Sequence, residues 1–137
     1  MRQLCLECGY AGASVRERIY WQERDETEGK DAMAGILLYT AAPDAEGTLG
    51  GLVALGEPES LGYHLRAAFE ELRICASDPI CSEHRPGGDG AELHGSACHA
   101  CLFAPETSCE RGNKFLERGV LVPTFDPQIT PFFPARD

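Results

Sequence analysis

The chain has 137 residues, of which 43% are apolar, and its formal net charge is −10. This length favours one domain with a modest hydrophobic core. There is no apolar run of the ~18 residues that a membrane span needs and no apolar leader behind Met1, so we expect a cytoplasmic protein with no membrane partner. The acidic charge argues against a protein that coats nucleic acid through basic residues alone, although it permits a local basic face or contact with DNA inside a larger complex.

The N-terminal half is predicted to be mainly extended. Residues 14–21 carry apolar and aromatic side chains among charges, which is typical of a strand, and residues 23–31 form a polar, mostly acidic connection. Residues 34–40 are a continuous apolar run that indicates a buried strand. Glycine and proline break the chain over residues 41–50, after which residues 51–55 could form a second strand that pairs with the first.

An amphipathic helix is predicted from Pro58 to about Cys75. Proline suits the first turn of a helix because its missing N–H is not needed there. The apolar residues that follow recur at helical spacing and would share one face: Leu61, Leu65, Ala68, Phe69 and Leu72. His64 lies beside this face, where a histidine is more often structural than a metal ligand.

A second helix is predicted over residues 108–118. Thr107 and Glu110 have the spacing of a capping box, in which each side chain bonds to the backbone of the other residue. Gly119 is placed to end this helix. Residues 120–122 could then form a short closing strand. Before the helix, Cys81 is followed by a flexible excursion that is rich in glycine.

The cysteines carry the chemistry of this chain. Seven cysteines in a reducing compartment indicate metal binding rather than disulfides. Cys98 and Cys101 form a Cys-x-x-Cys turn whose sulfurs can aim at one point, Cys109 follows in the first turn of the predicted helix, and Cys81 is the nearest cysteine upstream. Because Zn²⁺ takes four ligands in a tetrahedron, we predict one structural zinc site formed by Cys81, Cys98, Cys101 and Cys109.

A second cysteine pair lies near the N-terminus, in Cys5-Leu6-Glu7-Cys8-Gly9. Such a pair can be a zinc knuckle, but two small apolar residues at a helix end or in a strand are the interpretation that we favour. The alternative is a ribbon-like zinc site that combines Cys5 and Cys8 with Cys98 and Cys101.

These expectations define an α+β fold with a small antiparallel sheet, two principal helices and a four-cysteine zinc site. Residues 1–122 would form the zinc-binding domain. Residues 123–137 contain several prolines and would form an extended tail whose apolar side chains lie across the body or against a partner.

The most specific run of residues lies in the C-terminal half. Residues 94–113 read HGSACHACLFAPETSCERGN, and they resemble the C-terminal zinc-binding domain of the MrfA helicase family. The likeness extends upstream over residues 16–20, 34–40, 46–53 and 75–81. It implies a domain without its motor, because the Gly-x-x-x-x-Gly-Lys-[Ser/Thr] phosphate loop does not occur in this chain.

The resemblance also implies metal ligands and partners. Its cysteine pattern matches Cys81, Cys98, Cys101 and Cys109, with a longer connection after the first cysteine than the helicases have. An extra cysteine of the family pattern leaves Cys75 as the alternative first ligand. Relatives occur in the DISARM anti-phage defence system, so the expected partner is a helicase or another protein subunit of a defence or DNA-processing complex.

Three functions follow from these residues. A non-catalytic zinc-binding accessory module is favoured, because a site of four thiolates leaves no open position for water or substrate. A cysteine-dependent enzyme would use Cys109 as nucleophile with His94 or His99 as base. A DNA-contacting module would use the basic residues of the second helix, which neighbouring glutamates balance. These basic residues are Arg111, Lys114 and Arg118.

Overall fold

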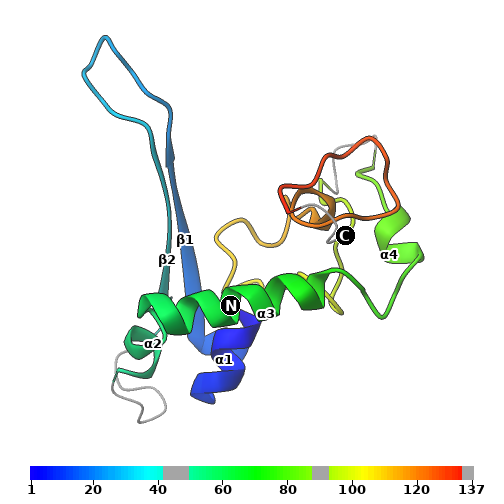
Figure 1. Cartoon of the computed structure of the whole chain (residues 1–137), viewed down its shortest axis with the longest axis horizontal. Helices are drawn as coiled ribbons and strands as arrows, with labels where there is room; N and C mark the ends of the chain where they lie inside the picture. Colours follow the sequence, from blue (N-terminus) through cyan, green and yellow to red (C-terminus); the bar gives the residue numbers. More distant parts are fainter. Residues whose placement is uncertain (42–49, 88–92, 134–137) are drawn as a thin grey trace.

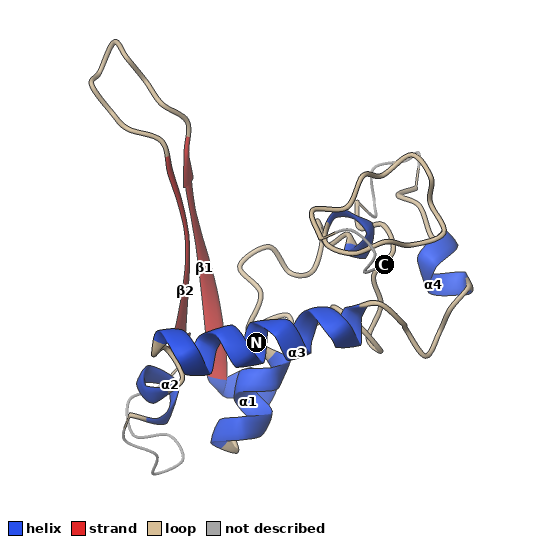
Figure 2. Cartoon of the chain, in the orientation of Figure 1, coloured by secondary structure: helices blue, strands red, loops and turns tan. Residues whose placement is uncertain are grey.

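The computed structural model describes residues 1–41, 50–87 and 93–133. Its elements in chain order are α1 (Arg2–Cys8), the 3-10 turn η1 (Gly12–Ser14), β1 (Val15–Gln22), β2 (Met33–Thr40), α2 (Gly51–Ala54), α3 (Pro58–Leu72), α4 (Ile80–Glu83) and the 3-10 turn η2 (Arg118–Val120). Helices and a two-stranded antiparallel sheet make this the mixed α+β fold that the sequence predicts (Figure 2). No helix within the described ranges is long and apolar enough to cross a membrane.

β1 and β2 form a hairpin that stands away from the rest of the chain (Figure 1). The strands are aligned over their whole length, from Val15 opposite Thr40 to Gln22 opposite Met33. Both predicted strands are therefore confirmed as strands. The second is not buried, however, because beyond the foot of the hairpin neither face is covered within the described residues, and Ile36 is 70% exposed.

A small apolar core lies at the foot of the hairpin. It consists of the buried residues Cys5, Tyr10 and Val15, with Met1, Cys8 and Leu52 packed against them. α1 ends at Cys8 because Gly9 adopts a left-handed conformation, with φ of 70°, that glycine reaches without strain. The N-terminal cysteine pair thus lies on a helix and packs into the core, which confirms the favoured interpretation.

Residues 51–55 contain a helix rather than the predicted strand. α2 begins after Gly50, whose φ of 87° turns the chain sharply. Gly51 then approaches the side chain of Cys8, since a Cβ at this glycine would lie 3.5 Å from the Cys8 sulfur. Packing against α1 therefore takes the place of pairing with the hairpin.

The helix predicted over residues 108–118 is wrong, because residues 106–115 form successive turns. Gly112 and Asn113 both have positive φ values, of 56° and 62°, and such residues interrupt a right-handed helix. The Asn113 side chain fixes this conformation by bonding to both the N–H and the C=O of Ala104, at 3.1 and 2.7 Å. Residues 120–122 likewise continue a 3-10 turn and do not form a strand.

α3 begins at Pro58 as predicted and ends at Leu72, a few residues before the expected end. His64 is buried on this helix, and its ring meets that of Tyr63 edge-on. The C-terminal segment returns to the same helix, where the Phe133 and Phe69 ring centroids are 4.1 Å apart. Three predicted stretches lie outside the described residues. They are residues 42–49 of the glycine- and proline-containing loop, residues 88–92 of the excursion after Cys81, and residues 134–137 of the tail.

Candidate metal centre

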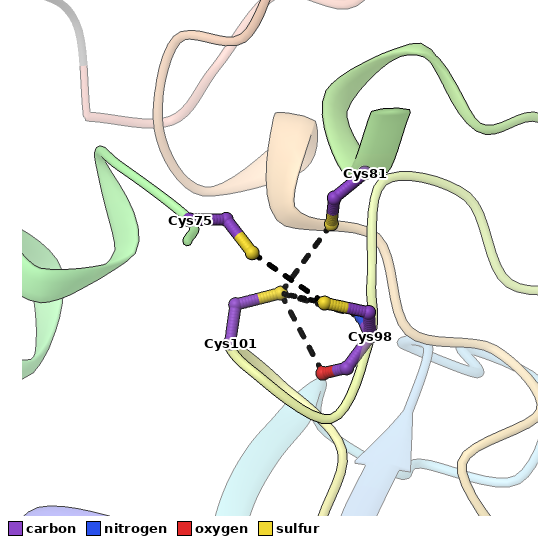
Figure 3. A group of neighbouring side chains, drawn as sticks. All are labelled: Cys75, Cys81, Cys98 and Cys101. Atoms are coloured by element: carbon purple, nitrogen blue, oxygen red, sulfur yellow. Dashed lines mark hydrogen bonds between the residues drawn. The ribbon is translucent and has the colours of Figure 1, made fainter. Parts of the chain in front are cut away.

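Four cysteine sulfurs converge on one point, as Figure 3 shows. They belong to Cys75, Cys81, Cys98 and Cys101, and all lie within 4.8 Å of one another. The sulfur of Cys75 lies 3.4 Å from that of Cys98, the sulfur of Cys81 lies 3.7 Å from that of Cys101, and the sulfurs of Cys98 and Cys101 are 3.8 Å apart. These distances are far longer than the ~2.05 Å of a disulfide bond, and all four thiols are free.

The spacing of the sulfurs fits a tetrahedral zinc ion. With Zn–S bonds of ~2.3 Å, a regular tetrahedron has sulfurs about 3.8 Å apart. The measured separations scatter around this value. Thiolates are also ligands that zinc prefers. The residues present therefore fit Zn²⁺, which supplies the folded chain with a cation that ties distant segments together.

The four thiols come from two segments of the chain. Cys75 follows the end of α3, and Cys81 lies in the short helix α4. Cys98 and Cys101 flank a tight turn, in which the Cys101 N–H and two following amides donate to the Cys98 carbonyl. The Cys98 N–H bonds to the Cys101 sulfur at 3.3 Å, and the Ser77 N–H bonds to the Cys75 sulfur at 3.4 Å. Such N–H donors stabilise negative charge on sulfur.

The thiols influence one another's ionisation. Burial raises the pKa of Cys81 and of Cys101, and hydrogen bonding with the neighbouring sulfurs adds to the effect at Cys81. Burial also opposes ionisation of Cys98, but hydrogen bonds from the Cys75 thiol and the Ala100 amide lower its pKa to about 6. Four thiolates in so small a space repel one another, so the set ionises completely only when a cation replaces the protons.

An ion pair between Arg118 and Asp78 fixes the position of the segment that carries Cys75. The Arg118 side chain is only 1% exposed, and its guanidinium donates to Asp78 at 2.6 Å and to the Leu72 carbonyl at 3.4 Å. The other oxygen of Asp78 accepts the Cys75 N–H at 2.8 Å. Arg118 therefore holds the end of α3 and the segment that carries Cys75 in one arrangement.

Arg118 also places a positive charge near the sulfurs. Burial works against its charge, but Asp78 and the nearby Cys81 and Cys101 sulfurs raise its pKa above the ordinary value. Burial likewise acts against ionised Asp78, but the bonds from Arg118 and the Cys75 N–H hold its pKa below the usual range. Four thiolates around one Zn²⁺ keep a net negative charge, which a buried guanidinium offsets.

The alternative of a DNA-contacting module placed Arg118 on one helix face with Arg111 and Lys114, and the burial of Arg118 contradicts this placement. Arg111 and Lys114 are exposed, but they lie on turns and do not form a helix face with it. The signal in the sequence is that apolar residues lie on both sides of Arg118, at positions 115–116 and 120–122. A lone arginine in such a run is buried only when it has a partner, and Asp78 provides one.

The second ligand segment is held by a carboxylate. Glu117 accepts the N–H groups of Ser96 at 3.0 Å and Gly119 at 2.8 Å. Gly95 makes room for this carboxylate, because a Cβ there would lie 1.4 Å from a Glu117 oxygen. The Ser96 hydroxyl in turn donates to the Ser82 carbonyl of α4 at 2.9 Å. This chain of bonds joins the segment before Cys98 to the helix that carries Cys81.

Cys109 lies outside the four-cysteine group, so the predicted set of Cys81, Cys98, Cys101 and Cys109 needs correction. Cys75 occupies the fourth position. The reason is that the predicted helix does not form, and residues 108–110 instead follow the edge of β1. The Glu17 N–H donates to the Ser108 carbonyl at 3.1 Å, which keeps the Cys109 segment beside the hairpin.

The residues proposed for a cysteine-dependent enzyme lie in two different cavities. Cys109 borders a depression at the foot of the hairpin, together with Arg16 and Tyr39. His94 and His99 line a separate cavity around Phe103, and both rings contact that phenylalanine edge-on. The geometry therefore offers neither histidine as a base beside this thiol.

These features define a class of protein: a small α+β domain in which two pairs of cysteines, brought together from separate segments, form a site that fits a zinc ion. Comparison with known families agrees, since the model of the MrfA Zn-binding domain matches residues 1–102. The chain belongs to the MrfA Zn-binding domain family, and its cofactor is Zn²⁺. The resemblance that the sequence suggested is thus confirmed.

A curated relative agrees with this assignment. The chain is 44% identical over 133 residues to the DISARM protein DrmB of Bacillus paralicheniformis. The matched residues make up 97% of this chain but only 22% of the relative. The chain therefore corresponds to about a fifth of that protein.

Proposed function

We propose that this chain is a non-catalytic, zinc-stabilised module that docks on a larger protein complex, with Cys75, Cys81, Cys98 and Cys101 as the four zinc ligands. The observation that carries the proposal is the convergence of four thiols on one point. A zinc ion with four thiolate ligands has no free position for water or substrate, so its role is structural.

The composition of the C-terminal half supports a structural role for the metal. Its buried apolar side chains are few and small, and within the described residues they form no cluster like the one at the foot of the hairpin. They are Cys75, Cys81, Ala97, Cys109 and Val122. Small domains that cannot bury enough apolar surface are commonly held by metals instead.

The surface supports docking on another protein. The accessible area is 9537 Å², whereas a compact monomer of this mass exposes about 7,000 Å². Large apolar side chains outside the hairpin are strongly exposed, on α2, on α3, on the segment around the zinc ligands and near the C-terminus. They include Val53, Tyr63, Ile74, Ile80, Phe125 and Phe132. Exposed apolar side chains in this number are typical of a surface that contacts another protein.

The proposed partner is a helicase or another protein subunit of an anti-phage defence or DNA-processing complex. The support is the similarity to a DISARM protein in which the matched domain accompanies a much longer chain. Contact with DNA would then pass through the complex, because the chain itself carries a net charge of −10.

Two measurements test this function. Metal analysis of the purified chain should give one zinc per chain, which chelation removes together with the folded structure of the C-terminal half. Affinity purification of the native complex should recover a helicase-class subunit with the wild-type chain. Recovery should be lost with Ile74→Asp or Ile80→Asp and retained with Lys114→Ala. A chain that folds fully without zinc, or recovery that the two aspartates do not affect, contradicts the proposal.

A further inference from the structure

The outer edge of β2 presents unpaired backbone groups. The Ala41 N–H donates to the Ser14 carbonyl at 2.7 Å, which fixes the alternation of bonds along the hairpin. Since bonded and non-bonded positions alternate in an antiparallel pair, every second residue of β2 turns its N–H and C=O away from β1. These residues are Ala34, Ile36, Leu38 and Thr40. No residue in the described ranges bonds to these outward groups.

The opposite edge of the hairpin is already occupied. On β1 the outward N–H of Glu17 donates to the Ser108 carbonyl at 3.1 Å, and that of Ile19 donates to the Glu110 carboxylate at 2.9 Å. Glu17 and Ile19 are therefore positions of β1 whose N–H groups point away from β2, as the alternation set by the Ala41–Ser14 bond requires. The hairpin therefore has one edge that is covered at Glu17 and Ile19, along β1, and one open edge, along β2.

The open edge lacks the devices that keep edge strands apart. β2 is eight residues long and contains no charged residue and no proline. Lysine, proline and bulges are the usual means by which proteins block strand addition. Ile19 and Trp21 of β1 lie opposite Ile36 and Ala34 of β2, so these four side chains share one face of the hairpin. This face also exposes apolar side chains, with Trp21 at 70% and Ile19 at 50% exposed. An isolated two-stranded sheet of this kind is only marginally stable in water.

We propose that β2 pairs with β2 of a second copy of this chain, so that two hairpins form one four-stranded antiparallel sheet across a twofold axis. This proposal goes beyond the proposed function and does not depend on it. Placing Leu37 opposite Leu37 of the second copy brings Ile36 opposite Leu38, and the outward backbone groups then face one another. In this register the apolar faces of the two hairpins become continuous.

The same geometry explains why two copies are expected rather than an open fibre. The pairing consumes both β2 edges, and the outer strands of the new sheet are the β1 strands that residues 108–110 cover. An isologous contact of this kind closes on itself. Because the strands are antiparallel and each hairpin stands away from its body (Figure 1), the two acidic bodies lie at opposite ends of the sheet.

Sedimentation velocity of the zinc-loaded protein tests the proposal. The wild-type chain, of 14.9 kDa, is expected to convert to a species of twice that mass as its concentration rises from the micromolar to the millimolar range. Ile36→Pro should remain monomeric, because it removes an outward N–H without removing a bond to β1. Ile36→Ala is the matched control: it loses the same side chain, keeps the N–H and should still dimerise.

Amide hydrogen exchange gives a second readout that needs no variant. In dilute solution the amides of Gly35, Leu37 and Tyr39 should be protected and those of Ala34, Ile36 and Leu38 should not. At high concentration both sets should become protected. A monomer at every concentration overturns the proposal, as does a dimer that Ile36→Pro leaves intact or whose outward amides stay unprotected, since another surface or another protein would then be the occupant.

Discussion

Arg118 stabilises the cysteine centre although it is not one of the four proposed ligands. Its guanidinium contacts Asp78, whose second oxygen receives the N–H of Cys75. One sulfur is therefore positioned through two intervening groups. Because Arg118 is buried, loss of its charge would leave Asp78 without its cation in a site that water reaches poorly.

Arg118→Met should lower the free energy of unfolding by about 1–3 kcal/mol, since the partly buried Asp78 loses its charged hydrogen-bond donor. The measurement is urea denaturation of the zinc-loaded protein. Arg111→Met, at an exposed position on the same segment, should change stability by less than about 0.5 kcal/mol. Equal effects of the two changes would show that Arg118 has no special role.

Cys75→Ser should abolish stoichiometric zinc binding, whereas Cys109→Ser should leave it intact. The physical reason is that, of these two cysteines, Cys75 belongs to the group of four converging sulfurs and Cys109 does not. Zinc content of the purified variants, measured by metal analysis, distinguishes the two. Retention of zinc by Cys75→Ser with loss in Cys109→Ser would restore the ligand set that the sequence alone suggested.

At the scale of elements, the sequence pattern predicted the structure correctly where residues close in the chain determine the conformation. The start of a helix at Pro58 and a strand over residues 14–21 were predicted from a proline suited to a first helical turn and from apolar and aromatic residues among charges. Both elements are present, as α3 and as β1 at residues 15–22. The Cys-x-x-Cys turn at Cys98 and Cys101 was also readable, because its geometry is local. The predicted Thr107–Glu110 capping box did not form, because the Glu110 carboxylate accepts a bond from β1, a segment about ninety residues earlier.

The fourth cysteine could not be chosen from sequence for the same reason. Cys75 and Cys109 are both plausible by spacing, and the choice depends on where α3 ends in space. The exposure of β2 could not be predicted either. An uninterrupted apolar run indicates a buried strand, and the sequence does not show whether another layer covers it. The sequence therefore predicted β1, β2, α3 and three of the four clustered cysteines. Long-range packing decided the remaining cysteine, the conformation of residues 51–55 and 106–122, and the exposed surface.

Gly95→Ala should destabilise the turn before Cys98 by about 1–3 kcal/mol, because the new methyl group displaces Glu117 and leaves the Ser96 and Gly119 N–H groups without their acceptor. Thermal unfolding measures the effect. Gly35→Ala is a suitable control, since nothing lies within 4 Å of its added Cβ. A similar loss in both variants would indicate a general cost of replacing glycine.

At the scale of the whole molecule, stability comes from two sources of different kinds. The N-terminal part has an apolar core around Val15, at the foot of the hairpin. The part after Arg73 depends on the cysteine centre and on the hydrogen bonds around it. Arg2 connects the two, since its guanidinium donates to the carbonyls of His99 and Ala100 beside the Cys-x-x-Cys turn, at 3.0 and 2.9 Å.

Removal of zinc should therefore act unevenly along the chain. Chelation is expected to increase amide exchange strongly over residues 75–87 and 93–133, with a smaller increase in α1 and β1. Hydrogen exchange with and without chelator checks this, and adding zinc back should restore protection. Uniform loss of protection would mean that the two parts unfold as one cooperative unit.

The family match ends at residue 102, yet Arg118 and Glu117 lie well past that point. A protein trimmed there would keep all four thiols but would lose the cation paired with Asp78 and the acceptor for the Ser96 N–H. It would also uncover the second edge of the hairpin, where Ser108 and Glu110 now bond. We therefore expect the shortest stable unit to extend past the stretch that the family model matches, and we expect shorter versions to bind zinc weakly and to aggregate through both strand edges.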